Sequence, residues 1–88
     1  MKAKEGFVLR CVVDEYIIMP TTENIDQFDG SVVLNGVSAF TWEKLQQDTT
    51  RDALLKALLD EYEVTEDVAE RELDNMLRRF LEYGLITP

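Results

Sequence analysis

In the amino-terminal half of the chain, short stretches of β-branched and aromatic residues stand between residues that favour turns. Residues 7–13 and 16–19 are two such stretches separated by an acidic pair, which predicts a β-hairpin. Pro20 cannot donate to a strand ladder, so we expect it to end the second strand. Residues 31–34, Ser-Val-Val-Leu, lie between Gly30 and an Asn-Gly pair, which predicts a third strand.

The carboxyl-terminal half changes to the spacing of amphipathic helices. Asn35 is a suitable cap for a helix over residues 36–47, and Thr49 with Asp52 has the spacing of a capping box before a Leu-rich second helix. Thr65 can cap a third and longest helix, which Gly84 ends. At about 100° per residue, the apolar positions of the third helix fall on one stripe that should face the core. Its members are Ala69, Leu73, Met76, Leu77, Phe80 and Gly84.

Three strands followed by three helices predict an α+β fold with a three-stranded antiparallel sheet. Such a small sheet, packed by helices on one face, should keep at least one free edge. The chain has 88 residues, enough for one modest core, so we predict a single domain over residues 1–88. The sequence contains neither a signal-peptide pattern nor an apolar run long enough to cross a membrane, which favours a cytoplasmic protein.

Charge and composition narrow the function. The 18 acidic residues exceed the 9 basic ones, and the formal charge of −9 would repel nucleic acids and anionic membranes. The chain has no histidine, which removes the commonest general base and metal ligand. We therefore predict a protein that is not an enzyme, needs no cofactor or metal, and binds neither nucleic acid nor membrane.

Two features that superficially suggest chemistry have simpler interpretations. Cys11, the only cysteine, alternates with Phe7 and Leu9, so we predict a small core residue and not a reactive thiol. The polar run at residues 24–30 resembles a calcium loop, but Phe28 stands where an oxygen ligand is needed. We expect that run to be a solvated loop.

Three blocks of sequence resemble the PqqD family and the related precursor-peptide recognition elements. The first is Phe-Val-Leu-Arg at residues 7–10 with the hairpin that follows it. The second is Val-Leu-Asn at residues 33–35, then Ala39 and Trp-Glu-Lys-Leu at residues 42–45. The third is the Leu-rich second helix, Tyr62 and Val64, and Leu-Glu-Tyr-Gly-Leu-Ile at residues 81–86. Together the blocks cover nearly the whole chain in the family's order.

The resemblance implies a winged-helix-like fold and a non-catalytic peptide chaperone. Its third strand would accept the leader of a ribosomally made precursor peptide as an added strand, with the third helix as the other wall of the groove. The implied partners are the precursor peptide and a peptide-modifying enzyme, often of the radical SAM type, in pyrroloquinoline quinone synthesis or the synthesis of another peptide product. The implied binding residues are Ser31, Val32, Val33, Leu34, Met76, Phe80 and Tyr83.

Three arginines of the third helix are further candidates for peptide binding. Arg71 and Arg78 share a helix face, with Arg79 beside it, and they would attract carboxylates of a leader. The alternative is a solvated face with local ion pairs such as Asp74 with Arg78. Trp42 also has two interpretations, a packing residue beneath the strands or a contact with a partner enzyme.

Two other functions fit three helices and a small sheet. One is a winged-helix transcription regulator, whose recognition helix would enter the major groove of DNA. The acidic charge argues against it, because phosphate contacts would be few. The other is a structural homodimer in which the free strand edge pairs with its copy.

Overall fold

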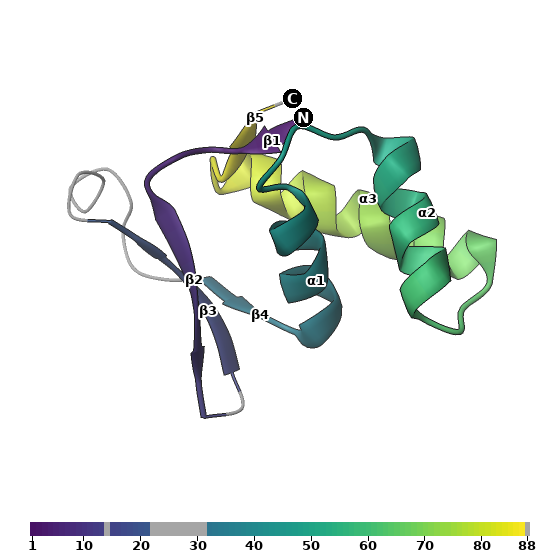
Figure 1. Cartoon of the computed structure of the whole chain (residues 1–88), viewed down its shortest axis with the longest axis horizontal. Coiled ribbons are helices and arrows are strands. Elements are labelled where there is room, and N and C mark those ends of the chain that lie inside the picture. Colours follow the sequence, from purple (N-terminus) through teal and green to yellow (C-terminus); the bar gives the residue numbers. More distant parts are fainter. Residues whose placement is uncertain (14, 22–31, 88) are drawn as a thin grey trace.

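The computed structural model describes residues 1–13, 15–21 and 32–87. A three-stranded antiparallel sheet and three helices make up most of it, so the predicted α+β fold is confirmed (Figure 1). The sheet has the order β2 (Phe7–Val12), β3 (Glu15–Pro20), β4 (Val32–Leu34), and the helices are α1 (Gly36–Lys44), α2 (Arg51–Glu61) and α3 (Glu66–Glu82). Ser31, predicted as the first residue of the third strand, and the run at residues 24–30 lie outside the described residues.

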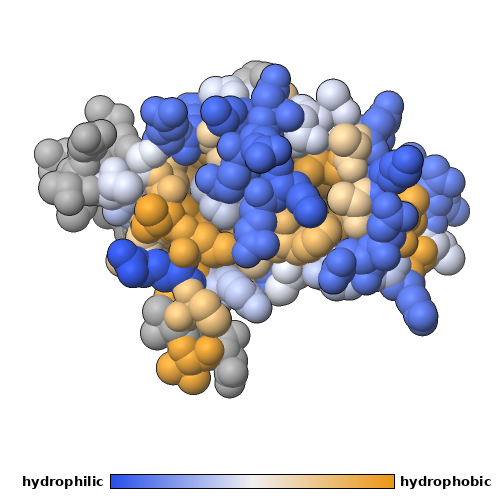
Figure 2. All heavy atoms as spheres, in the orientation of Figure 1, coloured by the Kyte–Doolittle hydropathy of each residue, from blue (hydrophilic) through white to orange (hydrophobic). Residues whose placement is uncertain are grey.

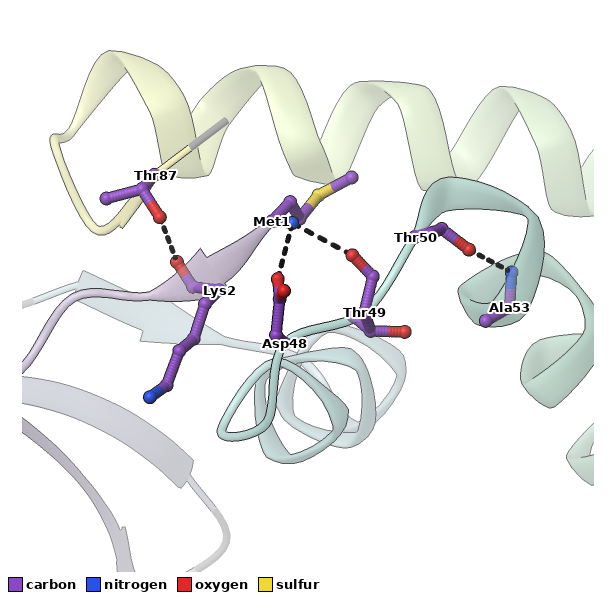
Figure 3. A network of polar contacts seen from close by, with 7 residues as sticks. All are labelled: Met1, Lys2, Asp48, Thr49, Thr50, Ala53 and Thr87. Carbon is purple, nitrogen blue, oxygen red and sulfur yellow. Dashed lines mark hydrogen bonds and ion pairs between the residues drawn. The ribbon is translucent and has the colours of Figure 1, made fainter.

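A second, two-stranded sheet was not predicted. β1 (Lys2–Ala3) pairs antiparallel with β5 (Ile86–Thr87), so the two ends of the chain lie side by side (Figure 1). Figure 3 shows the Met1 amino group between the Asp48 carboxylate and the Thr49 carbonyl oxygen, at 2.9 Å from each. These contacts tie the amino terminus to the segment between α1 and α2.

The helix caps explain where each helix begins. The side chains of Asn35 and Thr65 accept hydrogen bonds from the first turns of α1 and α3, as predicted. The predicted cap of α2 was wrong by one residue, because Thr50 accepts the bond from the Ala53 N–H at 3.1 Å. Thr49 is instead held by Met1, whose carbonyl oxygen accepts from the Thr49 N–H at 2.9 Å. α1 also ends at Lys44, three residues before the predicted end at residue 47.

The core lies among the three helices and includes Ile18 and Leu34 from the inner face of the three-stranded sheet. The predicted stripe of α3 is buried from Ala69 to Phe80, which confirms the inward face of that helix. Trp42 of α1 is 2% exposed and packs edge to face on Phe80, with ring centroids 5.7 Å apart. Its interpretation as a packing residue is therefore confirmed. Among the described residues, no helix is both long and apolar enough to cross a membrane.

The far end of the β2–β3 hairpin leaves this core. In Figure 1 the hairpin extends away from the helices, and Figure 2 shows hydrophobic atoms at its tip. Cys11 is exposed there, so its prediction as a core residue was wrong. Val13 at the tip is 88% exposed. The alternation along β2 does select one face, but on that face Phe7 and Leu9 pack against the core, whereas Cys11 is exposed.

Candidate functional site

β4 is an edge strand. It pairs on one side with β3, and no strand in the described part of the chain pairs with its other side. In the register of this pair, Val33 lies opposite Ile17, and the two side chains share the outer face of the sheet. Val32 and Leu34 alternate to the inner face, where Leu34 is buried.

The hydrogen-bond pattern shows which backbone groups of β4 are at the free edge. Thr21 donates its N–H to the Gly6 carbonyl oxygen at 2.7 Å, and bonded pairs alternate along antiparallel strands. The backbone groups of Tyr16 and Ile18 must then point toward β4, where the register places Leu34 and Val32 opposite them. The N–H and C=O of Val33 consequently point away from β3. They can serve as the donor and acceptor for an additional strand.

A groove of about 170 Å³ lies along this edge between β4 and α3. The strand contributes Val32, Val33 and Leu34, and the helix contributes Met76, Arg79, Phe80 and Tyr83. Asn35 and Ser38 close the groove at the start of α1. The groove therefore combines a free backbone edge with a helix wall on which the apolar Met76 and Phe80 lie beside Arg79 and Tyr83.

Contacts with α1 hold the apolar part of this wall, Met76 and Phe80, in place. Phe80 is packed on Trp42, and the Thr41 hydroxyl oxygen lies 3.8 Å from Met76 Sδ and 3.0 Å from the Val37 carbonyl oxygen. Both Met76 and Phe80 are 2% exposed, so they are core residues and also line the groove. Tyr83, in contrast, is 51% exposed at its end. The wall is thus rigid in its middle and accessible at Tyr83.

Arg79 brings positive charge to the groove. The first turn of α1, at the opposite wall, carries no acidic residue of its own to compensate the positive end of that helix. The other arginines lie elsewhere: Arg71 and Arg78 do not line the groove, and Arg78 donates to Asn75 Oδ1 at 2.8 Å. The predicted pair of Asp74 with Arg78 was wrong, because Asp74 bonds Arg51 of α2.

The comparisons with known proteins agree with this architecture. A family model described as "Coenzyme PQQ synthesis protein D (PqqD)" matches residues 15–86, which run from β3 to β5. The chain belongs to the PqqD family. The predicted resemblance is thereby confirmed, and the match contains both walls of the groove. No curated protein matches the sequence significantly.

Two solved structures share this PqqD fold. One is TbiB1 in complex with the TbiA(beta) leader peptide, with a TM-score of 0.75 and 22% sequence identity over 97% of this chain and 93% of that chain. The other is lasso peptide synthetase B1 complexed with a leader peptide, with a TM-score of 0.74 and 17% identity over 99% of this chain and 96% of that chain. At these identities the likeness establishes the fold.

The structure brings together seven of the ten predicted site residues of this PqqD-family chain. Arg71 and Arg78 are outside the groove, and Ser31 lies outside the described residues. Asn35 and Ser38 were missed, although the cap role of Asn35 already placed it beside the third strand. No group of three or more His, Cys, Asp or Glu side chains within residues 1–13, 15–21 and 32–87 can hold a metal ion.

Proposed function

We propose that this protein binds the leader segment of a ribosomally synthesised precursor peptide by adding it as a strand to β4, and presents it to a peptide-modifying enzyme. The free backbone edge at Val33, beside the groove between β4 and α3, carries the proposal. Membership of the PqqD family supports it. The two similar structures, which are described as complexes with leader peptides, point the same way.

Strand addition divides affinity and selectivity between two kinds of contact. The backbone of a leader would pair with the Val33 N–H and C=O whatever its sequence. Side chains on one face of the added strand would enter the groove against Met76 and Phe80, which selects apolar residues. An acidic leader residue near Arg79 would form the charged contact at the rim.

The proposed role is carriage without catalysis. The acidic, histidine-free chain would supply a rigid docking surface, and the chemistry would belong to the partner enzyme, with a radical SAM enzyme as our expectation. We also propose that residues 1–88 work as one domain in the cytoplasm. Pyrroloquinoline quinone is one product class that the family name suggests for the pathway.

The test is a titration of the protein with peptide, in which changes in the amide NMR signals are measured. The probes are synthetic peptides covering the amino-terminal segments of short reading frames encoded beside this gene. Binding should shift the amide signals of Val32, Val33 and Leu34 together with those along the groove side of α3. Undisturbed signals on both walls at saturating peptide would refute the proposal.

Two substitutions at one exposed position separate backbone pairing from side-chain contact. Val33→Pro removes an N–H that β3 does not use, so the β3–β4 ladder should survive while peptide binding falls by about tenfold. Val33→Thr keeps the N–H and the β-branched shape, and should bind as the original protein does. Both variants must keep the native circular dichroism spectrum.

Pairing of β4 with a second copy of the chain is the competing use of the same edge. Sedimentation measurements with and without peptide distinguish the two. Leader binding predicts a monomer that takes up peptide. A dimer that peptide cannot dissociate would show that the edge is occupied by the protein itself and would overturn the proposal.

A further inference from the structure

A second cavity lies beyond the groove, on the other side of the start of α1. Its volume is about 220 Å³, larger than that of the groove. Its lining is mainly apolar, with Glu72 as the one carboxylate. The lining includes Val37, Leu58, Tyr62, Val64, Val68 and Glu72.

The cavity and the groove are adjacent. Asn35 and Met76 line both of them, and on α3 the lining residues run along one face from Val68 through Glu72 and Met76 to Tyr83. Asn35 follows β4 directly, so a strand added to β4 and extended past Leu34 would enter the cavity. One extended peptide can therefore occupy both.

The two ends of this path differ in charge. Arg79 lines the groove and Glu72 lines the cavity, and both side chains are exposed. A bound peptide with an acidic residue near Arg79 and a basic residue near Glu72 would match the charges at both ends. The reversed arrangement would place like charges together. The charges therefore favour one orientation of a bound peptide.

Apolar surface at the cavity is also left exposed by the described part of the chain. Val64 and Val68 are 42% and 36% exposed, although they belong to a lining that includes the buried Leu58. Tyr62, on the same lining, packs edge to face on Phe40, with centroids 5.6 Å apart. The walls are thus set, and the two valines remain available to an incoming side chain.

We propose that this cavity binds a second apolar side chain of the same leader peptide. The inference rests on the proposed function and adds to it a spacing between two apolar residues of the leader. Glu72 and Phe80, each at the middle of the α3 wall of its site, are about 12 Å apart along the helix axis. An extended chain covers that distance in about four residues, and residues four apart lie on the same side of a strand. The recognised leader carries two apolar residues at about this spacing.

Peptide selection tests this spacing. The probes are peptides selected on the full chain from a displayed library of random peptides. The selected peptides should share two large apolar residues about four positions apart, with an acidic residue near one and a basic residue near the other. Replacing either apolar residue by serine should weaken binding about tenfold, the equivalent of one buried aliphatic side chain. Selected peptides with a single apolar anchor would overturn the inference.

A matched pair of variants on α3 tests the cavity itself. Val68→Gln places an amide in the cavity, whereas Leu81→Gln changes an apolar residue of similar exposure that lines neither site. Neither substitution changes the charge. Val68→Gln should weaken binding of the selected peptides about tenfold, whereas Leu81→Gln should leave their affinity unchanged. Circular dichroism verifies that both variants keep the fold.

The outcomes separate this inference from the proposed function. Weakening by Val33→Pro and by Val68→Gln supports both. If only Val33→Pro weakens peptide binding, leader binding at β4 stands, and the second cavity takes no part in it. If Val33→Pro does not change peptide affinity, strand addition is refuted. The proposed spacing of the two apolar residues, which depends on strand addition, is then refuted too.

Discussion

Arg51 at the start of α2 and Asp74 in α3 form a two-point ion pair between the helices. The Arg51 Nε lies 2.7 Å from Asp74 Oδ1, and Nη2 lies 3.1 Å from Oδ2. This parallel geometry suits a planar guanidinium and a carboxylate better than any single contact would. The pair links two helices that the sequence places 23 residues apart at this point.

We expect the pair to make stability depend on acid. The hydrogen bond from Arg51 lowers the pKa of Asp74, and the bond from the Met1 amino group lowers the pKa of Asp48. A carboxyl whose pKa is lower in the folded state contributes fully to the stability of the fold at pH values above its unfolded pKa of about 3.9. That contribution is lost as the pH falls through the pKa of the folded state. Urea midpoints should therefore decrease below about pH 4.

The double variant Asp48→Asn with Asp74→Asn tests this origin. Its urea midpoint should be lower than that of the original protein at neutral pH and should change less on acidification, because both carboxyls are gone. Asp60→Asn, at an exposed position of α2, is the control and should keep the original acid dependence. An unchanged acid profile in the double variant would contradict the assignment.

The two glycines at helix ends should respond oppositely to alanine. Gly84 has φ of +72° and ends α3, where the Leu85 N–H bonds the Phe80 carbonyl oxygen at 2.8 Å and the Gly84 N–H bonds that of Leu81 at 3.0 Å. Because a Cβ would meet nothing within 4 Å, the cost of Gly84→Ala is conformational, about 1–2 kcal/mol. Gly36→Ala, in the first turn of α1, should stabilise by about 0.5–1 kcal/mol. Thermal unfolding of the two variants measures both signs.

The hairpin tip contains a strained valine. Val13 has φ of +58°, a conformation that a β-branched residue rarely adopts, and Val12 pairs with Glu15 on either side of the connection. Asparagine tolerates this conformation, so Val13→Asn should raise the free energy of unfolding by about 1 kcal/mol. Peptide affinity should not change, because Val13 does not line the groove. A lower unfolding midpoint would show that Val13 is not strained in solution.

Arg79 should contribute to peptide binding more than the arginines outside the groove. Arg79→Glu reverses the one positive charge of the groove lining. The affinity for an acidic leader should fall by about three- to tenfold, and it should depend less on salt concentration. Arg71→Glu makes the same change of net charge away from the groove. Affinities at low and high salt compare the two. Equal losses would indicate a general charge effect and no contact at Arg79.

Much of the fold follows from short-range patterns in the sequence. The caps at Asn35 and Thr65, the inward stripe of α3 and its glycine end depend on residues within a few positions of one another. The alternation of residues 7–13 and 16–19 likewise predicted the hairpin, because side chains of a strand alternate between faces. The order of these blocks was enough to indicate the PqqD family.

The sequence by itself therefore determined the three strands and three helices of the main fold, the presence of a free strand edge and the absence of histidine chemistry. Only the tertiary structure decided which distant segments meet. It paired β1 with β5, strands too short to show a period, and it exposed Cys11 by leaving the hairpin end uncovered. It selected Arg79 over Arg71 and Arg78, joined Arg51 to Asp74, and opened the second cavity. Those outcomes depend on how helices pack against the sheet, which no local spacing specifies.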